Sequence, residues 1–109
     1  MANTYKVLGQ LAPAAATLST LYTVPSATST VCSTLVIANT GTSATTARVA
    51  IRPAGASLDI KHYIVYDLLV SPSDTAFLTL GISLATTDVV SVYANTANLS
   101  FSLFGTEVS

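Results

Sequence analysis

Apolar and polar residues alternate along several short segments of this chain, which is the pattern of β-strands with one buried face. In the segment ARVAIRP (47–53), the valine and the isoleucine fall on one face and the two arginines on the other. In LSFSLF (99–104), leucine, phenylalanine and leucine share a face opposite two serines and a phenylalanine. The segments 31–38 and 63–70 are apolar on both faces, which is typical of strands that are central or covered on their outer side.

Turn-forming residues separate these segments about every 8 to 15 positions, a spacing typical of antiparallel sandwiches and barrels. The predicted strands cover residues 5–10, 20–24, 30–39, 45–52, 62–70, 75–80, 89–94 and 99–108. The alanine-rich segment 11–20 is predicted to be a loop or arm, because Pro13 and the Ser and Thr content disfavour a helix. The fold class is therefore predicted to be all-β: an antiparallel β-sandwich, jelly-roll or Ig-like, with about eight short strands.

The composition bounds the class of protein. The chain has 109 residues, which corresponds to one domain spanning 1–109. Charged residues make up 8% of it and the net charge is −1, whereas ordinary soluble domains carry about 25% charged residues. Four scattered basic residues cannot form a face that neutralises phosphates, so nucleic acid is not an expected partner.

Membrane insertion and export are also disfavoured by the sequence. Proline and glycine interrupt the uncharged stretch between Lys6 and Arg48, so it lacks the roughly twenty consecutive apolar residues of a spanning helix. The start, MANTYKVLGQ, has no basic region followed by an apolar region, so no secretory signal is expected. The single cysteine, Cys32, excludes an internal disulfide framework. We expect a protein made in a reducing cytoplasm.

Few side chains could carry out catalysis. The only cysteine, Cys32, is predicted to lie in the middle of a strand as a small buried residue. The only histidine, His62, is predicted to be exposed at a strand edge. Asp67 lies five positions further on, so a regular strand would point the two side chains in opposite directions and prevent them from sharing a metal site. We therefore expect no catalytic, cofactor-binding or metal-binding residues, and a protein that is not an enzyme. The remaining aspartates at turns and strand starts are predicted to accept hydrogen bonds from backbone N–H groups: Asp59, Asp74 and Asp88.

Four residues are candidates for contacts between subunits. Arg48 and Arg52 share a strand face about 13 Å apart, and arginine is enriched at protein interfaces. They are either a solvated pair or hydrogen-bond donors to a neighbouring subunit. Tyr63 and Tyr66 are interpreted as packing or interface residues. The alternative is that Tyr63, Tyr66 or Tyr93 stacks against a sugar, as in a carbohydrate- or receptor-binding module.

The shortage of charge points to association. Ser, Thr, Ala and Asn occupy many of the predicted outward positions. These short residues suit a surface covered by another protein, whereas Lys and Glu are depleted in interface cores. The sequence therefore predicts a homo-oligomer, a trimer or ring, with more than about 1,000 Å² buried in each interface.

The order of segments YKVLGQ, LYTVP, STLVIANTG, ARVAIRPAG, HYIVYD, LTLGISLATTDVVSVYA and LSFSLFGTEV resembles a group of small virion structural proteins of tailed bacteriophages and prophages. The resemblance covers essentially the whole chain, and its most specific parts are LYTVP, RPAG, YIVYD and DVVSVYA. One departure is IANTG, where relatives are expected to carry a polar or basic turn. The resemblance implies a non-enzymatic component of the virion, made in the bacterial cytoplasm and in contact with other phage structural proteins. It would attach to the particle exterior, as a head decoration or as an accessory of the tail, neck or baseplate.

Overall fold

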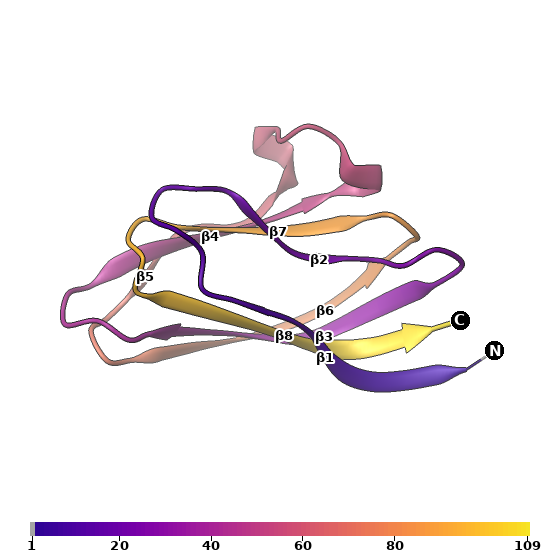
Figure 1. The fold of residues 1–109 in the computed structure, drawn as a ribbon, viewed down its shortest axis with the longest axis horizontal. Coiled ribbons are helices and arrows are strands. Elements are labelled where there is room, and N and C mark those ends of the chain that lie inside the picture. Colours follow the sequence, from indigo (N-terminus) through magenta and orange to yellow (C-terminus); the bar gives the residue numbers. More distant parts are fainter. Residues whose placement is uncertain (1) are drawn as a thin grey trace.

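The computed structural model describes residues 2–109 as two antiparallel four-stranded sheets packed face to face (Figure 1). The predicted β-sandwich of about eight strands is therefore confirmed. The elements are β1 (Asn3–Leu11), β2 (Ser19–Thr23), β3 (Ser29–Asn39), β4 (Thr45–Arg52), η1 (Pro53–Gly55), η2 (Ile60–His62), β5 (Tyr63–Val70), β6 (Thr75–Leu84), β7 (Val89–Ala94) and β8 (Leu99–Val108).

The strand order is that of a jelly roll. One sheet has the order β1-β8-β3-β6 and the other has the order β2-β7-β4-β5. The chain can be described as one long antiparallel two-stranded ribbon that ends at the β4–β5 connection. Its successive strand pairs are β1–β8, β2–β7, β3–β6 and β4–β5. Pairing of β8 with β3 and of β7 with β4 rolls this ribbon into two sheets. An Ig-like sandwich instead pairs its first two strands within one sheet, so only the jelly-roll prediction matches the structure.

The core lies between the two sheets and follows the alternation seen in the sequence. Leu35, Ile37 and Phe101 project inward from one sheet, and Val49 and Val92 project inward from the other. All five are at most 1% exposed. Burial of their apolar surface provides the main stabilisation of the sandwich.

The observed bounds of β4, β7 and β8 agree with the predicted ones. Strand β6 runs to Leu84 instead of ending at Leu80, because Gly81 adopts a φ of +64° and lets the chain continue its pairing with β3 beyond an irregularity. The segment predicted to be a loop or arm is shorter than expected. Leu11 ends β1 and Ser19 begins β2, so the connection covers residues 12–18.

The prediction for His62 is wrong. This residue ends η2, is only 8% exposed and does not lie in β5. Its Nδ1 accepts a hydrogen bond from the N–H of Asp59 at 3.0 Å, while the Asp59 carboxylate accepts one from Ile60 N–H at 2.6 Å. Asp59 and His62 form a capping box at η2, which holds the imidazole against the chain.

The predicted role of the other turn aspartates is confirmed. The Asp74 carboxylate accepts a hydrogen bond from Thr75 N–H at 2.8 Å. The Asp88 carboxylate accepts one from Ala54 N–H and one from Ala85 N–H, both at 2.9 Å. Asp88 thereby ties the β4–β5 connection to the turn between β6 and β7.

Within residues 2–109, no helix is long and apolar enough to cross a membrane.

Candidate functional site

Three of the four predicted contact residues gather on the outer face of the β2-β7-β4-β5 sheet. Arg48 projects outward from β4 and lies over the ring of Tyr66 from β5, with 4.3 Å between the guanidinium carbon and the ring centroid. The rings of Tyr63 and Tyr66 meet edge to face, with their centroids 4.9 Å apart. The fourth predicted residue, Arg52, ends β4, and its Nε is buried with no hydrogen-bond partner in the described chain.

The guanidinium of Arg48 is held from several sides. Its Nε donates to Asp67 Oδ1 at 2.6 Å, and its Nη2 lies 3.5 Å from Asp67 Oδ2. On β7, the Tyr93 ring centroid is 4.6 Å from the guanidinium carbon. The hydrogen bond to Asp67 raises the pKa of Arg48. Arg48, Asp67 and the three tyrosines are called the arginine–tyrosine cluster below.

Asp67 reaches this cluster because β5 bulges. Ala47 pairs with Leu68 and Val49 pairs with Val65, so β5 has one more residue than β4 across this interval. Asp67 adopts a φ of +52° there. A bulge re-aims the side chains that follow it, and both Tyr66 and Asp67 contact the outward-facing Arg48. Sequence reasoning missed Asp67 because it assumed a regular strand.

The outer face of the other sheet, β1-β8-β3-β6, has a different composition. Its outward positions are those that alternate with the core residues. Three rows across this sheet follow from the strand register: Phe77, Val36, Ser102 and Gln10; Thr79, Thr34, Phe104 and Val7; Ser83, Val31, Thr106 and Tyr5. None of the twelve side chains in these rows is charged. We call this surface the uncharged face.

The uncharged face contains the most exposed large aromatic residues of its sheet. Tyr5 is 79% exposed and Phe77 is 73% exposed, while Val7 and Val31 are 45% and 43% exposed. Isolated exposed apolar residues are normal on protein surfaces, whereas groups on one face mark interaction sites.

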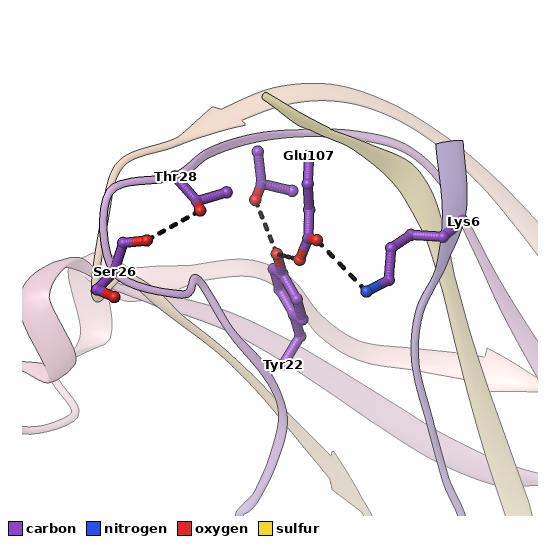
Figure 2. Close-up of polar contacts among 6 residues, drawn as sticks. Lys6, Tyr22, Ser26, Thr28 and Glu107 are labelled. Atoms are coloured by element: carbon purple, nitrogen blue, oxygen red, sulfur yellow. Dashed lines mark hydrogen bonds and ion pairs between the residues drawn. The ribbon is translucent and has the colours of Figure 1, made fainter. Parts of the chain in front are cut away.

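A polar network lies between the sheets near the chain termini (Figure 2). Tyr22 on β2 donates its hydroxyl hydrogen to Glu107 Oε2 on β8 at 2.6 Å. The same hydroxyl lies 2.8 Å from the hydroxyl of Thr30, and Lys6 Nζ donates to Glu107 Oε1 at 3.3 Å. In the neighbouring turn, the Thr28 hydroxyl donates to the Ser26 carbonyl at 3.0 Å.

This network shifts two ionisation equilibria. The hydrogen bond from Tyr22 is the largest influence on Glu107 and, together with Lys6, lowers the pKa of that carboxyl group. Burial, followed by the hydrogen bond to Glu107, raises the pKa of Tyr22 to about 12. Glu107 is thus held as an anion and Tyr22 as a neutral donor at neutral pH.

The two residues considered for nucleophilic chemistry lie in different elements. Cys32 is fully buried on β3, where burial raises the pKa of its thiol to about 11. The thiol is therefore protonated and inert at neutral pH. His62 lines a cleft of about 440 Å³ at the β4–β5 connection, with Lys61 and four apolar or proline residues: Ile51, Pro53, Ala56 and Ile64. Among residues 2–109, no three His, Cys, Asp or Glu side chains converge as metal ligands would.

Comparison with protein-family models, with curated proteins and with solved structures found no match to this chain. The resemblance to phage virion proteins therefore stays a prediction. The two sheets thus carry different outer surfaces, the uncharged face on one and the arginine–tyrosine cluster on the other.

Proposed function

We propose that the protein is a non-enzymatic structural component of a tailed-phage virion, which self-associates and attaches to the particle exterior. The observation that carries this proposal is the uncharged face of the β1-β8-β3-β6 sheet. Fold class alone would be a weak argument, because jelly rolls include viral capsid proteins, lectins and cupins.

The composition of the uncharged face makes it easy to desolvate. Soluble domains normally carry interspersed charges of both signs on their surfaces. Here all the rows named above are built from apolar, aromatic, Ser, Thr and Gln side chains. Lys6 and Glu107 occupy the alternate positions on β1 and β8, and their ion pair joins the polar network between the sheets. A face of this composition loses little hydration free energy when another protein covers it.

We propose that a second copy of this chain, related by a two-fold axis, covers the uncharged face, so the trimer or ring expected from the sequence would require a further interface. In a two-fold interface each residue meets a residue of the same surface, so any charge near the axis meets a like charge. Like charges placed together across an interface cost several kcal/mol. A face with no charge avoids this cost, and Phe77 and Tyr5 offer the aromatic contacts that are enriched in interface cores.

Self-association would also favour attachment to a symmetric particle. A symmetric assembly presents the same small patch many times, so weak contacts to a scaffold of matching symmetry add up. The resemblance to virion structural proteins suggests a phage head, neck, tail or baseplate as that scaffold. Attachment to the exterior suits a domain of 109 residues.

The proposal predicts that a charge at a highly exposed position of the uncharged face disrupts association. Phe77→Glu would bury an unpaired carboxylate in an uncharged interface and is expected to weaken self-association at least about tenfold. Leu69→Glu is the matched control, since Leu69 is 64% exposed on β5 in the opposite sheet. Sedimentation velocity over a concentration series measures the effect, and near-unchanged melting temperatures would show that both variants are folded.

Wild-type protein that stays monomeric at high concentration would contradict self-association, as would equal association of both variants. The particle itself is tested by mass spectrometry of purified virions and by cryo-EM. Absence of the chain from the virions would contradict the structural role.

A further inference from the structure

The arginine–tyrosine cluster lies on the sheet opposite the uncharged face and plays no part in the proposed assembly. Tyr66 is 58% exposed although its ring also contacts Arg48 and Tyr63. The Asp67 side chain is 44% exposed, and that of Arg48 is 25% exposed. The cluster therefore presents an aromatic ring, a carboxylate and a guanidinium together at the surface.

The polar groups of the cluster are fixed in place before any ligand arrives. Two tyrosine rings and the 2.6 Å bond to Asp67 restrain the Arg48 guanidinium. The bulge at Asp67 holds that residue at a φ of +52°, a conformation that costs free energy for a residue other than glycine. Restraint of this kind reduces the entropy lost on binding.

The hydrogen-bonding capacity of the pair is only partly used within the chain. Asp67 Oδ2 lies 3.5 Å from Arg48 Nη2, a long contact that leaves this oxygen capacity to accept a further hydrogen bond. Arg48 is a donor only and Asp67 an acceptor only, whereas a hydroxyl group both donates and accepts. Two adjacent hydroxyls of one ligand would satisfy such a pair.

The charge of the pair selects the class of ligand. The positive charge of Arg48 and the negative charge of Asp67 cancel, so the cluster has no excess positive charge to attract a phosphate or carboxylate group. Arg48 lies over one face of the Tyr66 ring, and the part of this residue that stays exposed offers an apolar surface against which a sugar can stack. A neutral pyranose combines these features, with C–H groups on its faces and hydroxyls on its rim.

We propose that the arginine–tyrosine cluster binds neutral carbohydrate. The Tyr66 ring is the stacking surface, and Asp67 and Arg48 bind adjacent hydroxyls of the sugar. Tyr63 positions the Tyr66 ring, and Tyr93 positions the Arg48 guanidinium. The site acts independently of self-association through the uncharged face.

The test is an array of neutral oligosaccharides, built from glucose, galactose and N-acetylhexosamines, followed by titration of the best-bound oligosaccharide. Tyrosine fluorescence can follow that titration, because the chain has no tryptophan. Tyr66→Ala and Asp67→Ala are each expected to weaken binding about tenfold or more. Tyr66→Phe keeps the ring and is expected to retain binding within about threefold. Phe77→Ala, on the opposite sheet, is the control and leaves binding unchanged.

Thermal melting would establish that each variant is folded before its binding is compared. Absence of binding to every neutral oligosaccharide on the array overturns the inference. Equal binding by wild type, Tyr66→Ala and Asp67→Ala also overturns it, because the ligand would then lie elsewhere. A monomeric Phe77→Glu variant that still binds sugar separates this site from the proposed assembly.

Discussion

Glu107 connects the two sheets where the chain termini meet. The first and last described residues, Ala2 and Ser109, exchange backbone hydrogen bonds of 2.6 and 2.9 Å at this end of the molecule (Figure 1). The bond from Tyr22 to Glu107 then joins β2 in one sheet to β8 in the other. Because Tyr22 is only 7% exposed, loss of this acceptor would leave a buried hydroxyl with Thr30 as its remaining partner.

Glu107→Gln is expected to lower the free energy of unfolding at neutral pH by about 1–2 kcal/mol, because a hydrogen bond to a charged acceptor becomes one to a neutral amide. The folded pKa of Glu107 lies below its ordinary value, which is about 4.3. Ionised Glu107 therefore stabilises the folded state at pH values above its ordinary pKa. This contribution to the free energy of unfolding is lost as the pH falls through the lowered pKa of the folded state. Urea unfolding at a series of pH values should show the difference between wild type and variant narrowing in this acidic window.

Lys6→Met serves as the control for this prediction. The ammonium of Lys6 contacts the same carboxylate, but its side chain is 45% exposed. Exposed ion pairs contribute at most about 1 kcal/mol, so the variant should stay close to wild type. A difference between wild type and Glu107→Gln that is constant from neutral to acidic pH would show that Glu107 does not titrate through this contact.

At the scale of single elements, alternation predicted strands well and failed where strands bulge. The bounds of β4, β7 and β8 follow from regular alternation bordered by turn residues. Regular alternation would place the neighbouring residues Tyr66 and Asp67 on opposite faces of β5. A bulge instead brings both side chains into contact with the same arginine, Arg48. The tyrosines and Arg48 could thus be proposed from the sequence, while Asp67 depends on an irregularity that pattern does not encode.

The pairing of β8 with both neighbours predicts a strict requirement for Gly105. A Cβ at this position would lie 2.2 Å from the carbonyl oxygen of Val31 and 3.0 Å from Leu8 Cδ1. Because β8 is hydrogen-bonded to β1 and β3 on its two sides, its backbone cannot move away from either strand freely. Gly105→Ala is therefore expected to lower the free energy of unfolding by about 2–3 kcal/mol.

Gly81→Ala is the comparison for this prediction. Gly81 has a φ of +64°, but a Cβ there would meet no atom within 4 Å. Its cost is limited to the backbone conformation, about 1 kcal/mol. Urea unfolding of both variants measures the difference, and an equal loss of stability would contradict the steric argument.

At the scale of the whole molecule, the strand order could not be read from the sequence. Apart from β4–β5, the strand pairs that follow the ribbon join residues from distant parts of the chain, as where Asn3 pairs with Val108. Local patterns limit the fold to a sandwich, but partner choice depends on how complete sheets bury their inner faces. The contact between Tyr22 and Glu107 was missed for the same reason, since 85 positions separate them.

The dependence of self-association on salt is expected to separate the proposed assembly from one held by ion pairs. Raising ionic strength from about 0.1 M to about 1 M shortens the screening length from about 10 Å to about 3 Å. Contacts through the uncharged face have no ion pairs to screen, so the dissociation constant for self-association should stay within about threefold of its low-salt value. An excluded salt such as sulfate should strengthen association, because it favours burial of apolar surface. Sedimentation velocity in sodium chloride and in sulfate tests this expectation. If sodium chloride weakened self-association tenfold or more, the interface would be formed by Arg48, Arg52 or other charged groups. Tyr5 and Phe77 would then lie outside it.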